Sequence, residues 1–229
     1  MMLRLGVATP VLACIVALPV ASQQPVPAVE QLAGRVPDAV VAVVRELAPS
    51  AAARGLPIDP LIQKALEGSA KGVPADLVAN AVRQVVAQLD TAATGLHEGG
   101  LSAPDTVLVA AGGFAVNAGL HDRDIAEVAS SGAPAISLVV GLRVAGTLAA
   151  LGVPPADAVN LVTASLRAGN QPGELLGLPG RVQAEVAHGV PPGQAAKGLA
   201  RAAAAQGGRR GGGPPPGRGR PAHPPHPRP

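Results

Sequence analysis

A tripeptide of Gly, an aliphatic residue and Pro recurs along the chain and limits how the chain can fold. Copies begin at Gly55, Gly72, Gly152, Gly177 and Gly189, and Gly119, Leu120 and His121 form a degenerate sixth copy. Gly can take the left-handed conformation that ends a helix, the aliphatic residue can fold back on the last turn, and Pro favours the start of the next helix. The tripeptide therefore predicts joints between successive helices. Because its copies are unevenly spaced, we expect no fixed solenoid period.

Hydrophobic periodicity supports the same fold class. Apolar residues recur about every four residues after Pro74, at Leu77, Val78, Ala81, Val82, Val85, Val86 and Leu89. The segment from Asp38 to Ala48 is rich in Val but also has helical spacing, and no run alternates between apolar and polar residues as a half-buried strand would. The sequence therefore predicts an all-α domain over residues 23–206, an irregular bundle or array of about eight to ten short helices.

The core of this domain must be built almost entirely from aliphatic side chains. Hydrophobic residues make up 48% of the chain, yet Phe114 is its only aromatic residue. Small and branched side chains allow helices to approach closely. Binding clefts for sugars and for single-stranded nucleic acids generally use aromatic platforms, so the composition argues against both functions for the folded part.

The first 22 residues have the order of a secretory signal peptide. Arg4 precedes an apolar run from Leu5 to Ala21, and small or modest side chains at Val20 and Ser22 suit cleavage after Ser22. A retained membrane anchor is the alternative, although Gly and Pro residues interrupt the run. The sequence therefore predicts export to the periplasm, the cell envelope or the medium. Its wealth of Ala, Gly, Pro and Arg indicates a bacterial source with a GC-rich genome.

Cys14 is the only cysteine and lies inside the predicted signal peptide. The residues before it loosely resemble a bacterial lipid-attachment box, but the chain stays apolar after Cys14, which disfavours lipidation. Cleavage after Ser22 would leave a chain without thiols or disulfides. We expect stability to come from packing alone, with no cofactor and no metal site.

The basic residues are concentrated at the C-terminal end. Residues 23–206 carry all 15 acidic residues but 12 of the 18 Lys and Arg residues. The segment 207–229 is rich in Gly and Pro and is predicted to be disordered. It carries five arginines that are candidates for binding an anionic polymer: Arg209, Arg210, Arg218, Arg220 and Arg228. A solvated spacer is the alternative, and the acidic body argues against nucleic acid as a partner.

One cluster of residues suggests catalysis. His121, Asp122, Asp124 and Glu127 place an imidazole and three carboxylates within one short segment. An imidazole with paired carboxylates can bind a metal ion or perform acid-base chemistry, as in a small hydrolase. Acidic residues just after Gly119 are expected from helix capping and the helix dipole alone, and this interpretation is favoured over catalysis.

These observations rank three functions. The first is a non-catalytic exported module that binds a protein partner in the cell envelope or has a structural role there. The second is a hydrolase or metal-dependent enzyme centred on the His121 cluster. The third is a polyanion binder that acts through its tail. No transmembrane span is expected after signal cleavage, since Arg143 interrupts the apolar stretch from Ile136 to Leu151.

Overall fold

The computed structural model describes residues 29–211, and within this range every regular element is a helix. This confirms the all-α prediction. The predicted signal peptide and Cys14 lie outside the described residues, as do Arg218, Arg220 and Arg228. The helices are α2 (Asp38–Ala53), α3 (Asp59–Ala70), α4 (Ala75–Glu98), α5 (Thr106–Asn117), α6 (Asp122–Ala129), α7 (Ala135–Ala150), α8 (Pro155–Arg167), α9 (Pro172–Leu176), α10 (Leu178–Ala187) and α11 (Pro192–Gly211).

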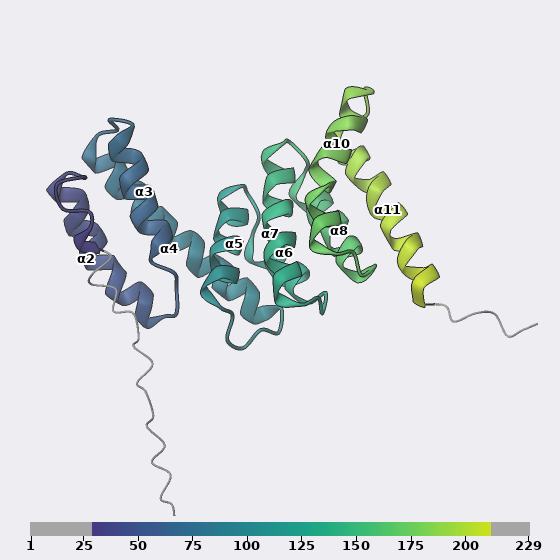
Figure 1. The fold of residues 1–229 in the computed structure, drawn as a ribbon, viewed down its shortest axis with the longest axis horizontal. Coiled ribbons are helices and arrows are strands. Elements are labelled where there is room, and N and C mark those ends of the chain that lie inside the picture. The colour runs from purple at the N-terminus through teal and green to yellow at the C-terminus, as the bar shows by residue number, and fades with distance from the viewer. Residues whose placement is uncertain (1–28, 212–229) are drawn as a thin grey trace, which may run out of the picture.

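The helices form an elongated array (Figure 1), in which their contacts define two rows. In one row α2 contacts α4, α4 contacts α6, α6 contacts α8, and α8 contacts α11. In the other row α5 contacts α7 and α7 contacts α9. Each helix therefore packs mainly on helices that are close to it in sequence, and α2 and α11 lie at opposite ends of the array (Figure 1).

The joint before α8 illustrates how helices are connected. Gly152 has a φ of 87°, which a residue with a side chain rarely adopts. The amide of Val153 donates to the carbonyl of Leu148 at 3.0 Å, Val153 is buried, and Pro154 precedes the first turn of α8. Gly55, Gly72, Gly119 and Gly189 also have positive φ.

The copy at Gly177 differs from the others. Its φ is −76°, and it alone separates α9 from α10. Pro179 lies inside the first turn of α10 instead of preceding that helix. Gly177 therefore does not adopt the left-handed conformation that the tripeptide predicted.

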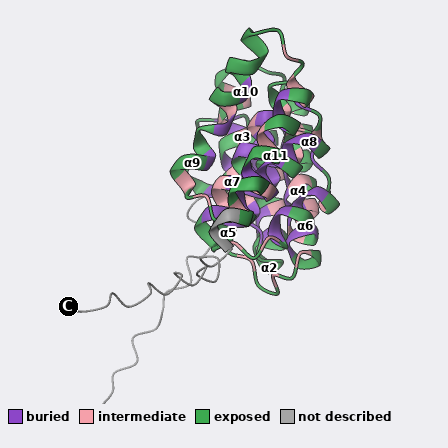
Figure 2. Ribbon diagram, turned by 90° about the vertical axis from the view of Figure 1, so that its right-hand side faces the viewer, coloured by how far each residue is buried: buried purple, intermediate pink, exposed green. Residues whose placement is uncertain are grey.

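The core consists of Ala, Val, Leu and Ile side chains between the two rows. Figure 2 shows buried residues on the sides of the helices that face one another. Glycines bring some backbones very close: a Cβ atom on Gly95 of α4 would lie 2.4 Å from the carbonyl oxygen of Asp122 at the start of α6. Leu77, which the periodicity placed on the buried face of α4, is instead 53% exposed, because that part of the first turn is not covered by another helix.

Helix α11 continues to Gly211, past the boundary expected at Gln206. A Cβ on Gly207 would lie 3.1 Å from the Cα of Ala168, so α11 still approaches the end of α8 at this point. Residues 207–211 of the expected tail are thus helical. Among the helices of residues 29–211, none combines the length and apolarity needed to cross a membrane.

Candidate functional site

The His121 cluster forms the beginning of α6. The backbone amide of His121 donates to Oδ2 of Asp124 at 2.8 Å, and Nδ1 of His121 lies 3.5 Å from the same oxygen. The carboxylate of Asp124 is largely buried, whereas the imidazole is exposed. Asp124 therefore caps the first turn of the helix, satisfying an amide that has no partner within the helix.

Neither of the other two carboxylates bonds to this pair, although Asp122 and His121 both line a hollow with Thr91, Val116, Gly119 and Leu120. Asp122 accepts a hydrogen bond from the amide of Arg123 at 2.8 Å. Glu127 lines a groove with residues of α8 and α11. Within the described part of the chain, no group of three or more His, Cys, Asp or Glu side chains is placed to hold a metal ion. The geometry of His121 and Asp124 is that of a helix cap.

A first hollow, here called the Phe114 groove, lies between α3, α4 and α5 and has a volume of about 250 Å³. Its apolar lining comes mainly from α4 and α5, and polar side chains from α3, α4 and α5 also line it. The residues that line it are Pro60, Gln63, Lys64, Glu67, Val85, Gln88, Leu89, Ala110, Gly113, Phe114 and Asn117.

Phe114 is 47% exposed in this groove although it is the largest apolar side chain of the sequence. Its ring packs against α7: a Cβ on Gly146 would lie 2.9 Å from Cε1 of Phe114. Because one part of the ring is fixed on α7, the remaining part stays accessible in the groove. Aromatic side chains bury a large apolar area when a partner covers them, so an accessible ring that is held in place can serve as a contact for a partner.

Charged residues of α3 surround one side of the Phe114 groove. Glu67 lies between Lys64 and Lys71 and forms ion pairs with both. The hydrogen bond from Lys71, together with the charge of Lys64, lowers the pKa of the Glu67 carboxyl below its usual value. Of these three residues, Lys64 and Glu67 line the groove, so its rim presents one cation and one carboxylate that stays ionised at neutral pH.

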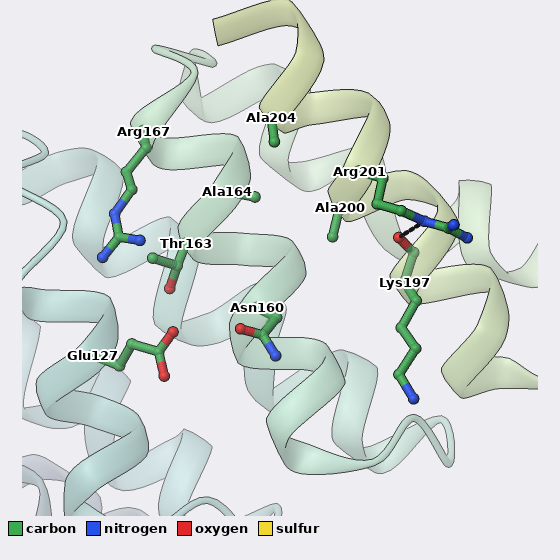
Figure 3. A pocket seen from close by; sticks show the side chains of 9 residues that line it. All are labelled: Glu127, Asn160, Thr163, Ala164, Arg167, Lys197, Ala200, Arg201 and Ala204. Carbon is green, nitrogen blue, oxygen red and sulfur yellow. Dashed lines mark hydrogen bonds between the residues drawn. The ribbon is translucent and has the colours of Figure 1, made fainter. Parts of the chain in front are cut away.

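A second hollow, here called the Thr163 groove, lies between α6, α8 and α11 (Figure 3). It has a volume of about 570 Å³. Alanines from α8 and α11 form an apolar wall, and charged and polar side chains surround it. The lining residues are Glu127, Asn160, Thr163, Ala164, Arg167, Lys197, Ala200, Arg201 and Ala204.

Thr163 is 2% exposed, and its Oγ1 has no hydrogen-bond partner. Three other helix hydroxyls bond to the carbonyl four residues earlier: Thr91 to Ala87, Thr147 to Arg143, and Ser165 to Leu161. The hydroxyl of Ser69 in α3 lacks a partner, as that of Thr163 does. A buried hydroxyl without a partner costs free energy. Thr163 is therefore a polar atom at the groove that the fold itself does not use.

Neither groove was predicted from the sequence. Phe114 is the only aromatic residue of the chain, and this composition argued against aromatic binding sites. Thr163 lies beside Val159, Val162 and Leu166, which form the apolar stripe of α8. A single Thr in such a stripe does not indicate a binding site. Of the predicted polyanion-binding arginines, Arg209 and Arg210 lie in the last turns of α11; the others fall outside the described residues.

Comparisons of the chain with protein-family models, with curated proteins and with solved structures gave no match.

Proposed function

We propose that this chain is an exported, non-catalytic module that binds a protein partner in the cell envelope through the Phe114 groove. One observation carries the proposal: Phe114 is half exposed in a groove although its ring is held against α7. The signal-like order of residues 1–22 supports export. The capping role of Asp124 supports a non-catalytic role for the segment around His121.

The groove suits a partner segment with one or two apolar anchor residues. Its volume of about 250 Å³ corresponds to the space of a few side chains and is small for a whole helix. Val85, Leu89 and Gly113 line the groove together with Phe114 and offer apolar contact. Lys64 and Glu67 at the rim offer charged groups of both signs, which would orient the partner more than they would strengthen its binding.

Site-specific photo-crosslinking in the native cell tests this proposal. A photoreactive phenylalanine analogue at position 114 retains the aromatic ring and should crosslink to one defined protein. The same analogue at Val186, an exposed apolar position on α10, is the matched control and should not capture that protein. Equal capture from both positions, or no capture from position 114, would contradict the proposal.

A second experiment distinguishes binding through the groove from binding through the basic tail. A chain that ends at Gly211 keeps α11 complete but lacks Arg218, Arg220 and Arg228. If the groove binds the partner, this chain retains the crosslink from position 114. If the crosslink disappears with the tail, the arginines carry the interaction, as expected for a polyanion binder whose binding weakens strongly with salt.

A further inference from the structure

The Thr163 groove contains polar groups that come together from separate helices. Figure 3 shows the guanidinium of Arg167, the carboxylate of Glu127 and the amide of Asn160 on the same side of α8 as the hydroxyl of Thr163. Lys197 and Arg201 extend away from this group along α11 (Figure 3). The hydroxyl therefore lies among one cation, one anion and one amide.

Arg167 and Glu127 are exposed side chains, and neither has an ion-pair partner within the described residues. Arg167 and Glu127 form no ion pair with each other, whereas Lys197 pairs with Asp157 at 3.5 Å. Thr163 Oγ1, which is almost wholly buried, lacks a partner as well. A ligand that satisfies all three must offer an anionic group, a cationic group and a hydrogen bond within a small span.

We propose that the Thr163 groove binds a free aliphatic amino acid. The carboxylate of the ligand would pair with Arg167 and its ammonium group with Glu127, while Thr163 and Asn160 would supply hydrogen bonds. The apolar side chain would lie along the wall formed by Ala164, Ala200 and Ala204. A simple anion would satisfy Arg167 but would be repelled by Glu127, so a zwitterion fits the charges better.

The proposal is independent of the Phe114 groove, because the residues that line the two hollows are different. It is tested by NMR titration of the ¹⁵N-labelled full chain with leucine. Leucinamide lacks the carboxylate, and N-acetylleucine lacks the ammonium group. Leucine should cause saturable shifts of the amide resonances of α8 around Thr163, and each analogue should bind about tenfold more weakly at the same ionic strength.

Substitutions distinguish a zwitterion site from an anion site. Arg167→Gln and Glu127→Gln should each weaken leucine binding about tenfold, because each removes one charged contact. Thr163→Val should weaken it without loss of thermal stability. The controls Arg143→Gln on α7 and Glu185→Gln on α10 make the same changes of net charge at positions that do not line the groove, and they should leave binding unchanged.

Three results would overturn the proposal. The first is the absence of saturable shifts with leucine. The second is tighter binding of leucine or N-acetylleucine after Glu127→Gln, which would show a site for simple anions. The third is an equal loss of binding in the control variants, which would show that only the net charge matters. Circular dichroism of each variant confirms that a loss of binding does not reflect loss of the fold.

Discussion

Lys197 of α11 places its Nζ atom 3.5 Å from Oδ2 of Asp157 in the first turn of α8. Asp157 is one of the few charged residues that are buried in the described structure, while the ammonium group of Lys197 remains mostly exposed. A Cβ on Gly193 would lie 2.7 Å from the same carboxylate oxygen. The start of α11 therefore packs closely on the start of α8 around the Asp157 carboxylate.

This pair predicts unequal effects of its two partners on stability. Asp157→Asn should lower the free energy of unfolding by about 1 kcal/mol, because a neutral amide interacts more weakly with Lys197 than the buried carboxylate does. Lys197→Met should lower it by less than about 0.5 kcal/mol, since the ammonium group is screened by solvent. Urea denaturation followed by circular dichroism measures both. A larger effect of Lys197→Met than of Asp157→Asn would contradict this account.

Close contact between α4 and α6 gives a second prediction. Gly95→Ala should destabilise the fold by about 2 to 3 kcal/mol, because the new Cβ would overlap the Asp122 carbonyl oxygen unless α6 moved. Gly198→Ala in α11 is the control, because a Cβ there meets nothing within 4 Å. It should stabilise the chain by about 0.5 to 1 kcal/mol through helix propensity. Thermal melts compare the two, and destabilisation of similar size in both would show that the close contact is unimportant.

The cap at α6 predicts which residue of the His121 cluster matters for folding. Asp124→Ala should cost about 1 kcal/mol, because the amide of His121 loses its acceptor. His121→Ala should have little effect on stability, since the imidazole is exposed. Denaturation curves of the two variants show which of the two residues stabilises the start of α6. A stability loss in His121→Ala that equals that of Asp124→Ala would show that the imidazole is part of the cap.

The sequence predicted the helices better than it predicted their surfaces. Periodicity after Pro74 identifies α4, because local hydrogen bonding and one buried face determine a helix. It does not reveal that Leu77 is exposed, since this depends on which neighbouring helix covers the first turn. The tripeptide at Gly177 looks like the others, but its left-handed conformation is absent because α10 begins immediately after Gly177.

The grooves could not be predicted for the same reason. Phe114 and Gly146 are distant in sequence, and only the packing of α5 on α7 brings them together. Thr163 and Glu127 likewise meet at a groove only because α6, α8 and α11 are neighbours. The His121 cluster, by contrast, was visible because its residues are adjacent in sequence, and adjacency at the start of a helix more often reflects capping than chemistry.

The proposed export gives a prediction about the N-terminus of the protein isolated from cells. Mass spectrometry of the envelope or extracellular fraction should find a chain that begins at Gln23, because Val20 and Ser22 suit signal peptidase. Ser22→Arg should block cleavage and leave the longer chain in the membrane fraction. A wild-type protein that retains residues before Ser22 would contradict cleavage at this site, and a chain that begins at a lipid-modified Cys14 would show a lipoprotein.

Thr163 gives a prediction about stability that is separate from ligand binding. Thr163→Val replaces a buried hydroxyl that has no partner by a methyl group of similar size. Because the unpaired hydroxyl costs free energy in the folded state, the substitution should raise the free energy of unfolding by about 1 kcal/mol. Thr147→Val is the control: its hydroxyl bonds to the Arg143 carbonyl, so no gain is expected. Urea denaturation in the absence of amino acids measures both, and destabilisation by Thr163→Val would show that the hydroxyl contributes to the fold.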